Sequence, residues 1–214
     1  PIFKNINYGL DLKGGFEVLY EIEPLDGNKL TSDMVYNTYK AILKRVDILG
    51  VNEPEIAIED NNKIRIALAG IKNKEEAREV ISSTAVLSFR DYNDNLLMTS
   101  DVLGGEAKVT TDQYGHPAVS LSIKDTDKFY NVTNKVKDMN NNVIVIWLDY
   151  DENSDSFSKE KDKCGSLSSS RCLSAARVEK AFASDVIIQG NFTTEEATSL
   201  VELINSGSLP TKLN

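Results

Sequence analysis

Residues 8–22 read YGLDLKGGFEVLYEI, and every even-numbered position of this stretch is apolar or glycine. Four of the odd-numbered positions, from Asp11 to Glu21, are charged. A period of two over this length predicts extended chain with one buried face and one exposed face. The adjacent Gly14 and Gly15 interrupt the pattern, and glycine inside a strand pattern is typical of a bend or bulge. The stretch therefore predicts two strand segments joined at a glycine kink.

The composition of the whole chain is that of a globular protein of one or two domains. The chain has 214 residues, of which 41% are hydrophobic and 27% charged. Its net charge of −9 argues against nucleic acid as a partner, because phosphates require clustered Lys and Arg. The same charge argues against electrostatic docking on anionic lipid.

Membrane spans and targeting signals are not evident in the sequence. No run approaches the roughly 18 apolar residues that a membrane helix needs. The N-terminus lacks the basic and then apolar pattern of a signal peptide. We expect any such segment of the native protein to lie outside this sequence.

The first 92 residues predict the order strand, helix, hairpin, helix and strand. The predicted segments after the opening strand are a helix from Thr31 or Ser32 to Gly50, strands at 55–59 and 63–69, a helix from Asn73 to about Thr84, and a strand at 87–92. This β-α-β-β-α-β order is that of the ferredoxin-like arrangement.

The second half predicts further strands and helices around a polar insert. The predicted segments are a strand at 119–123, a helix capped by Asp125, a central strand at 143–148, a mobile insert at 151–173, a strand at 185–189 and a helix whose capping box is Thr193 with Glu196. The type of structure at 175–182 is left open. The apolar residues of 119–123 and 129–139 are interpreted as core.

Cys164 and Cys172 lie in the polar insert and allow two interpretations. A metal site is disfavoured because the spacing is too wide for CxxC and His116, the one histidine, is distant in sequence. Free surface thiols are one alternative. A local disulfide is the other, and it would indicate an oxidising, extracytoplasmic environment.

No arrangement of residues indicates an enzyme or a cofactor site. Asp11 and Lys13 lie beside two glycines, but no phosphate-binding motif follows them. Asp149, Asp151 and Glu152 lack the spacing and glycine of a calcium loop. The sequence predicts a binding or mechanical module without catalytic residues, metal or cofactor.

Three stretches resemble one family of protein-export membrane proteins, SecD and the fused SecDF. The first is similar to the family's LDLxGG segment and comprises Gly9, Leu10, Asp11, Leu12, Gly14 and Gly15. The second, which begins at Arg45 and includes Gly50, is similar to R-x-x-x-x-G-V-x-E-P. The third comprises Gly190, Phe192 and Thr193, followed by Gly207, Leu209 and Pro210, and resembles the segment that precedes the second membrane helix.

The resemblance implies the first large extracytoplasmic domain of SecD or SecDF. It implies an α+β fold with a ferredoxin-like base at 1–85 and 190–214 and an inserted α+β head at 86–189. It also implies a place at the cell membrane, on the extracytoplasmic face.

In that family the domain would capture preprotein emerging from the channel and aid export driven by the proton-motive force. Its partners would be unfolded preprotein, a SecYEG-type channel, and SecF or the SecF half of the same chain. We expect an apolar groove or a free strand edge as the contact surface, with unknown lining residues. The alternative is a cell-surface ligand-binding or adhesive ectodomain not involved in export.

Overall fold

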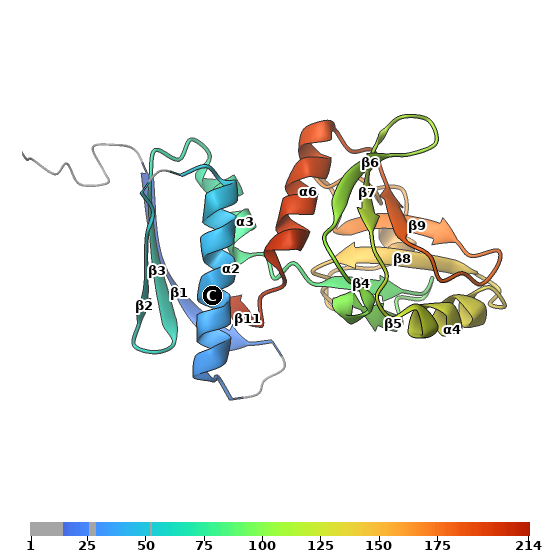
Figure 1. Cartoon of the computed structure of the whole chain (residues 1–214), viewed down its shortest axis with the longest axis horizontal. Coiled ribbons are helices and arrows are strands. Elements are labelled where there is room, and N and C mark those ends of the chain that lie inside the picture. Colours follow the sequence, from blue (N-terminus) through green and yellow to red (C-terminus); the bar gives the residue numbers. More distant parts are fainter. Residues whose placement is uncertain (1–14, 26–28, 52) are drawn as a thin grey trace, which may run out of the picture. The chain divides into compact units, whose positions relative to one another are not determined.

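The chain forms two compact units that are described here one at a time. The computed structural model describes residues 15–25, 29–51 and 53–214 (Figure 1). Unit 1 comprises Pro1–Thr84 and Ser206–Asn214, and unit 2 comprises Ala85–Asn205. Unit 2 is therefore an insertion, in sequence, into unit 1. Both units combine helices with antiparallel sheets, which confirms the predicted mixture of the two kinds of structure.

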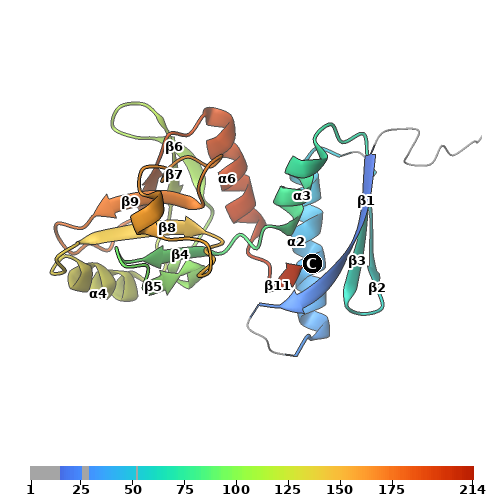
Figure 2. The same cartoon turned by 180° about the vertical axis from the view of Figure 1, so that it is seen from behind.

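Unit 1 is a four-stranded antiparallel sheet with helices on one face. Its elements are β1 (Gly15–Pro24), α2 (Ser32–Ile48), β2 (Glu55–Glu59), β3 (Lys63–Ala69), α3 (Lys74–Ser82) and β11 (Thr211–Leu213). The strand order is β11-β1-β3-β2, and each neighbouring pair is antiparallel. Figures 1 and 2 show α2 and α3 on the same side of this sheet.

The predicted periodicities account for the core of unit 1. Alternate residues of β3, Ile64, Ile66 and Leu68, are fully buried against Ile42 and Val46 of α2. The predicted hairpin is confirmed, since β2 pairs with β3 in register from Glu55 to Glu59. The helix start is also confirmed, because the side chain of Thr31 accepts a hydrogen bond from the Met34 N–H at 3.2 Å.

One predicted strand belongs to the other unit. The strand expected at 87–92 is β4 (Leu87–Arg90), and it pairs with β5 and β8 in unit 2. The position that it was expected to take in unit 1 is held by β11, near the end of the chain. The prediction was wrong because it assumed that the next strand along the chain completes the sheet of unit 1. That sheet is completed instead by β11, which follows unit 2 in the sequence.

Unit 2 contains two antiparallel sheets. The first has the order β5-β4-β8-β9 and the second β10-β7-β6. The remaining strands are β5 (Leu96–Thr99), β6 (Lys108–Thr111), β7 (Pro117–Leu121), β8 (Val143–Leu148), β9 (Cys172–Arg177) and β10 (Val186–Gln189). The helical elements are η1 (Ser100–Val102), α4 (Thr126–Val136), α5 (Phe157–Glu160) and α6 (Thr194–Ser206).

Strand β8 is central and is covered on both faces. Ile144 and Ile146 pack into the main core of unit 2, together with Phe129 of α4. The intervening Val145 and Trp147 pack on the opposite face in a separate apolar cluster. The two coverings explain the continuously apolar sequence of this strand and confirm its predicted central position.

Helix α6 packs in unit 2, and this shifts the expected domain boundary. Its Ala197 and Leu200 are buried in the main core of that unit. The side chain of Asn205 exchanges two hydrogen bonds with the backbone of Ala107, at 2.8 and 3.0 Å. Residues 190–205, expected in the base, therefore lie in unit 2, and only the segment from Ser206 onward returns to unit 1.

Arg45 is a fully buried cation at the point where the chain re-enters unit 1. Its guanidinium donates to the carbonyl oxygens of Ile81 and Ser83, at the end of α3. It also donates to the Ser206 hydroxyl and to the Gly207 carbonyl oxygen, both at 3.2 Å. Because a buried guanidinium is costly without partners, these bonds fix α2, the end of α3 and the returning segment together.

We predict that Arg45→Ala lowers the free energy of unfolding by about 3 kcal/mol, because it leaves buried carbonyl groups without donors. Urea unfolding measures this change. The control is Lys44→Ala, which alters the exposed neighbour on the same helix and is expected to change stability by less than about 0.5 kcal/mol. Equal effects of the two substitutions would contradict the assigned role of Arg45.

Candidate functional site

The residues of the three family-like stretches fall in different parts of the fold. Gly9, Leu10, Asp11, Leu12 and Gly14 lie outside the described residues, and Gly15 is the first residue of β1. Gly50 follows α2 with a φ of +64°, the left-handed conformation predicted for a helix end. Gly207 has a φ of +89°, and Leu209 is buried, with its N–H bonded to the Thr84 carbonyl oxygen at 2.8 Å. Pro210 precedes β11 directly.

Gly190 occupies a position that has no room for a side chain. A Cβ placed there would lie 2.6 Å from Cζ of Phe192 and 2.8 Å from the Gly165 carbonyl oxygen. Phe192 is itself buried in the main core of unit 2. The glycine therefore permits the close approach of two segments, the polar insert and the start of α6.

Thr193 forms the predicted capping box at the start of α6. Its N–H donates to the Glu196 carboxylate at 2.8 Å, and its hydroxyl accepts the Glu196 N–H at 3.1 Å. These bonds satisfy two backbone donors that the first helical turn leaves unpaired. The sequence from Gly190 to Thr193 thus has a structural role, which is to set where α6 begins.

We predict that Gly190→Ala destabilises the chain by about 2 kcal/mol, because the added methyl must displace a buried ring or a backbone carbonyl. Thermal and urea unfolding measure the change. Gly115→Ala is the matched control, since Gly115 has a φ of +87° but open space around it. Its cost of about 1 kcal/mol would come from backbone strain alone. A Gly190→Ala cost no larger than the control would show that the close approach is unimportant.

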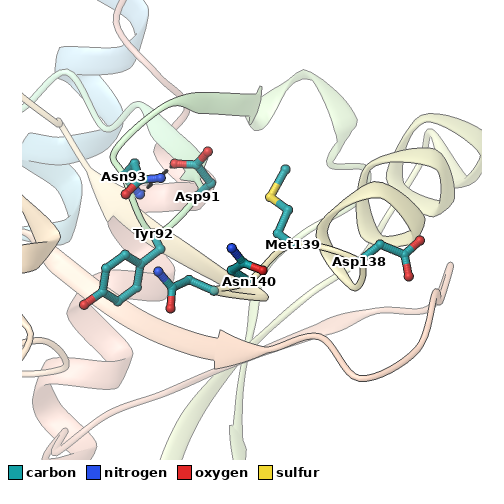
Figure 3. Close-up of a pocket in the computed structure, with 7 residues that line it drawn as sticks. Asp91, Tyr92, Asn93, Asp138, Met139 and Asn140 are labelled. Atoms are coloured by element: carbon teal, nitrogen blue, oxygen red, sulfur yellow. Dashed lines mark hydrogen bonds between the residues drawn. The ribbon is translucent and has the colours of Figure 1, made fainter.

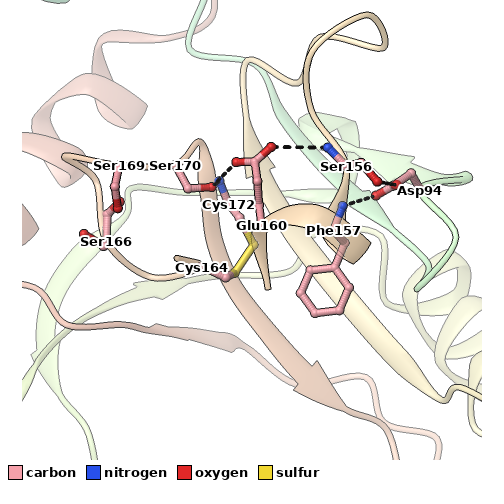
Figure 4. The surroundings of a disulfide bond; sticks show 9 residues. All are labelled: Asp94, Ser156, Phe157, Glu160, Cys164, Ser166, Ser169, Ser170 and Cys172. Atoms are coloured by element: carbon pink, nitrogen blue, oxygen red, sulfur yellow. Dashed lines mark hydrogen bonds between the residues drawn. A yellow bond between two sulfur atoms is a disulfide. The ribbon is translucent and has the colours of Figure 1, made fainter. Parts of the chain in front are cut away.

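The polar insert, predicted only as a mobile segment, folds over one face of the first sheet, with the helix α5 and apolar contacts of its own. Cys164 and Cys172 form a disulfide with a Cα–Cα separation of 4.7 Å (Figure 4). Phe157 of α5 is buried beside Trp147 and the disulfide cysteines. Its ring also meets the Tyr92 ring edge to face, with 5.5 Å between centroids. The insert therefore carries a small apolar core that its composition did not reveal.

Asp94 connects the insert to the turn between β4 and β5. Its carboxylate accepts the Ser156 hydroxyl at 2.9 Å and the Phe157 N–H at 2.9 Å, as Figure 4 shows. Its carbonyl oxygen accepts Nη1 of Arg90 at 2.7 Å, and the Arg90 guanidinium lies 3.6 Å from the centroid of the Tyr150 ring. Sequence reasoning missed Asp94, although its place in an Asn-Asp-Asn turn was a signal for a left-handed residue.

The acidic residues of the insert are used by the backbone and by Arg171. Asp155 is nearly buried; it accepts the Asp151 N–H at 2.8 Å and pairs with Arg171 at 3.1 Å. Hydrogen bonds from Asn153 hold the pKa of Asp151 below its usual value. Burial raises the pKa of Tyr150, and the nearby carboxylate of Asp94 adds to this effect.

Two of the three acidic residues considered as calcium ligands, Asp149 and Asp151, accept hydrogen bonds from backbone N–H groups. Asp149 accepts the N–H groups of Ala85 and Val86, at 3.2 and 2.8 Å. Within residues 15–25, 29–51 and 53–214, no group of three or more His, Cys, Asp and Glu side chains converges as metal ligands would.

The disulfide is predicted to stabilise the insert. Replacing both cysteines, Cys164→Ser with Cys172→Ser, should lower the free energy of unfolding by about 2.5 kcal/mol, because the unfolded chain gains loop freedom. Amide hydrogen exchange should also become faster across α5 and the following turn. The control is Ser168→Ala with Ser169→Ala, two exposed positions inside the same loop. Unchanged stability and exchange in the cysteine-free variant would refute the prediction.

An open depression of about 510 Å³ lies between the residues that follow β4 and those that follow α4 (Figure 3). It is lined by Asp91, Tyr92, Asn93, Asp138, Met139, Asn140 and Asn141. Asp91 is occupied by its own turn, since Oδ1 accepts the N–H groups of Asn93 and Asn95 at 2.8 and 3.0 Å. The lining is mostly amide and carboxylate, with Met139 and Tyr92 as its apolar part. It has the character of a polar surface hollow rather than of a catalytic cleft.

Most of the residues that the sequence predicts as core are buried, so they do not line the expected polypeptide-binding groove. Val119, Leu121, Phe129 and Val136 are buried in unit 2, as interpreted from the sequence. Tyr130, inside the range 129–139, is exposed, which corrects the core interpretation at that residue. The other exposed large apolar side chains of unit 2 are Leu96, Val109, Tyr114 and Ile187. In the part of the chain that the structure describes, no helix is both long and apolar enough to cross a membrane.

Comparison with known proteins gives two adjacent family matches. Residues 35–94 match the model of the N-terminal part of the P1 domain of protein translocase subunit SecDF. Residues 91–211 match the model of the SecDF P1 head subdomain. The second match alone covers more than half of the chain.

Curated relatives extend this similarity along the whole chain. A protein translocase subunit SecDF from Bacillus subtilis is 46% identical over 218 residues, which cover 100% of this chain and 29% of the relative. A protein translocase subunit SecD from Dictyoglomus turgidum is 32% identical over 203 residues, covering 95% of this chain and 46% of the relative. The chain thus spans less than half of either relative.

Solved structures show the same fold. A crystal structure of SecDF in a super-membrane-facing form has a TM-score of 0.69 and 24% identity, covering 100% of this chain and 31% of that one. A second structure, of a membrane component SecDF that enhances protein export, also has a TM-score of 0.69, with 23% identity, covering 93% of this chain and 97% of that one. The two family matches, together with this shared fold, define the class of the chain as a P1-type domain with a head subdomain.

The particular family follows from the matches along the sequence. The chain belongs to the SecD/SecDF family of protein translocase subunits. This confirms the family that the three sequence stretches indicated.

Proposed function

We propose that this chain is the first large extracytoplasmic domain of SecD or of a fused SecDF at the cell membrane. In this role it captures unfolded preprotein as it leaves a SecYEG-type channel and aids export driven by the proton-motive force. SecF, or the SecF half of the same chain, is the proposed partner in the membrane. The observation that carries the proposal is the match of 91–211 to the head subdomain, with 46% identity to a SecDF along the full chain.

We also propose that unit 1 is a ferredoxin-like base and that unit 2 is the head. Antiparallel pairing in the order β11-β1-β3-β2 supports this assignment, with helices following β1 and β3. In such a β-α-β-β-α-β arrangement the two strands of each β-α-β half flank a strand of the other half. In sequence, the proposed head is then inserted between α3 and β11 of the proposed base.

The described surface of unit 2 is compatible with weak, sequence-tolerant contact. Its exposed apolar side chains are scattered over β5, β6, β10 and α4. Unfolded polypeptides offer backbone hydrogen bonds and dispersed apolar groups, so a head of this kind needs no single deep pocket. We propose binding and mechanical work, without catalysis, and the names of the relatives as translocase subunits support this.

The test is binding of the 214-residue chain to one preprotein in two forms, held unfolded and folded after removal of its signal. Amide NMR titration should show weak, saturable shifts with the unfolded form only, and the shifting residues should belong to unit 2. The folded form is the matched control, because it has almost the same composition. Absence of binding to either form, together with tight binding of a small ligand, would instead favour an ectodomain unrelated to export.

A further inference from the structure

Strand β9 is an edge strand whose outer backbone groups are identifiable from the pairing. It pairs with β8 on one side and is the last strand of its sheet. Asn142 and Val178 are opposite each other, and the Val178 N–H donates to the Asn142 carbonyl oxygen at 2.7 Å. In an antiparallel ladder, bonded and non-bonded pairs alternate. The N–H and C=O groups of Ala175 and Arg177 therefore point away from β8.

The end of β9 that carries these groups is open to solvent. Ala175, Ala176 and Arg177 are all exposed, although their side chains alternate between the two faces of the sheet. In the described part of the chain, no hydrogen bond reaches the N–H or C=O of Ala175 or Arg177 from outside the β8–β9 pair. Arg177 is the one charged side chain among these three residues, and the two alanines leave the rest of this end without the bulky or charged side chains that usually protect an edge strand.

The other end of the same edge is already occupied by a segment of this chain. Arg171 and Leu148 form a bonded pair through the Leu148 N–H at 3.0 Å, so the Cys172 carbonyl points outward. The Gly165 N–H donates to this carbonyl at 2.8 Å, and the Gly165 carbonyl accepts the Asn191 N–H at 2.8 Å. Backbone of the insert is thus bonded to the β9 edge at Cys172. Strand β10 also approaches β9, but no hydrogen bond joins it to Ala175 or Arg177.

We propose that an extended segment of a secretory polypeptide adds to the β9 edge at Ala175 and Arg177, continuing the backbone pairing that Gly165 makes at Cys172. The occupant is defined by chemistry, since alternating N–H and C=O groups along an edge are matched by another extended backbone. Such pairing takes any sequence without proline at the paired positions. The inference rests on the proposed function, because it names where the unfolded polypeptide would be held.

The first test follows individual amides by hydrogen exchange and NMR in the 214-residue chain. In the free chain, the Ala175 and Arg177 amides should exchange fast, and the Ala176 and Ile144 amides should be protected. The probe is a capped ten-residue peptide that alternates valine and glutamine, with a second peptide carrying proline at alternate positions as control. The first peptide should slow exchange at Ala175 and Arg177 by at least tenfold, and the second should not. Protection of both amides in the free chain would overturn the proposal.

The second test uses substitutions matched by geometry. Ala175→Pro removes an outward N–H and leaves the bonds to β8 intact, so it should weaken probe binding about fivefold or more. Thr111→Pro is the control: the Asp112 N–H donates to the opposite His116 carbonyl, so the N–H of the preceding Thr111 points away from β7 on a different edge. It should change the dissociation constant less than twofold. Circular dichroism and thermal unfolding establish that both variants are folded.

The outcomes separate this inference from the proposed function. If unfolded preprotein binds unit 2 but the β9 amides and Ala175→Pro have no effect, the β9 site is wrong and preprotein capture stands. If neither preprotein nor peptide binds the chain, the capture function itself fails. Equal loss of binding in the Ala175→Pro and Thr111→Pro variants would also overturn the β9 assignment.

Discussion

The burial of one guanidinium determines how unit 1 is completed. Arg45 comes from the last turns of α2, yet its hydrogen-bond acceptors belong to the end of α3 and to Ser206 and Gly207. A charged group without solvent must be surrounded by acceptors, so these segments cannot take other positions without leaving it unsatisfied. The buried hydroxyl pair of Thr38 and Thr211, 2.7 Å apart, makes a second polar link between α2 and the last strand. Polar contacts thus fix the position at which the segment from Ser206 onward packs on α2. Apolar packing alone would specify that position less closely.

In unit 2 the comparable constraint is the close approach of two backbone segments, at Gly165 and at Gly190. Gly165 and Gly190 bring the insert against the residues that begin α6, and the disulfide fixes the insert a residue away from this contact. Asp94 adds a link from the β4–β5 turn to α5. The polar insert is therefore a structural part of unit 2, and its Gly165 backbone is bonded to the edge strand β9 at Cys172.

Much of the local structure could be predicted, because it depends on neighbours in sequence. The Thr31 cap, the hairpin of β2 and β3, the central position of β8 and the capping box of Thr193 all depend on residues within a few positions or on period alone. The replacement of β4 by β11 in unit 1 could not be predicted in this way, since it depends on pairing across an insertion. The folded structure of the insert was missed for a related reason. The insert has few apolar residues, and one of them, Phe157, packs against Trp147, which is distant in sequence. The resemblance to a family predicted the class of protein, but the spacing of residues did not predict which surface contacts a polypeptide.

The insertion of unit 2 between α3 and β11 has a consequence for the order in which the parts of the fold can form during synthesis. Residues 22–24 of β1 pair with the last strand, and all of unit 2 intervenes in the chain. The apolar cores of unit 2 can form while the edge of β1 that pairs with β11 is still unpaired. Contacts so distant in sequence are slow to form, and an unpaired edge invites wrong pairing. All residues of unit 2 therefore precede the last strand that unit 1 needs, and unit 1 becomes complete only when residues 211–213 are available.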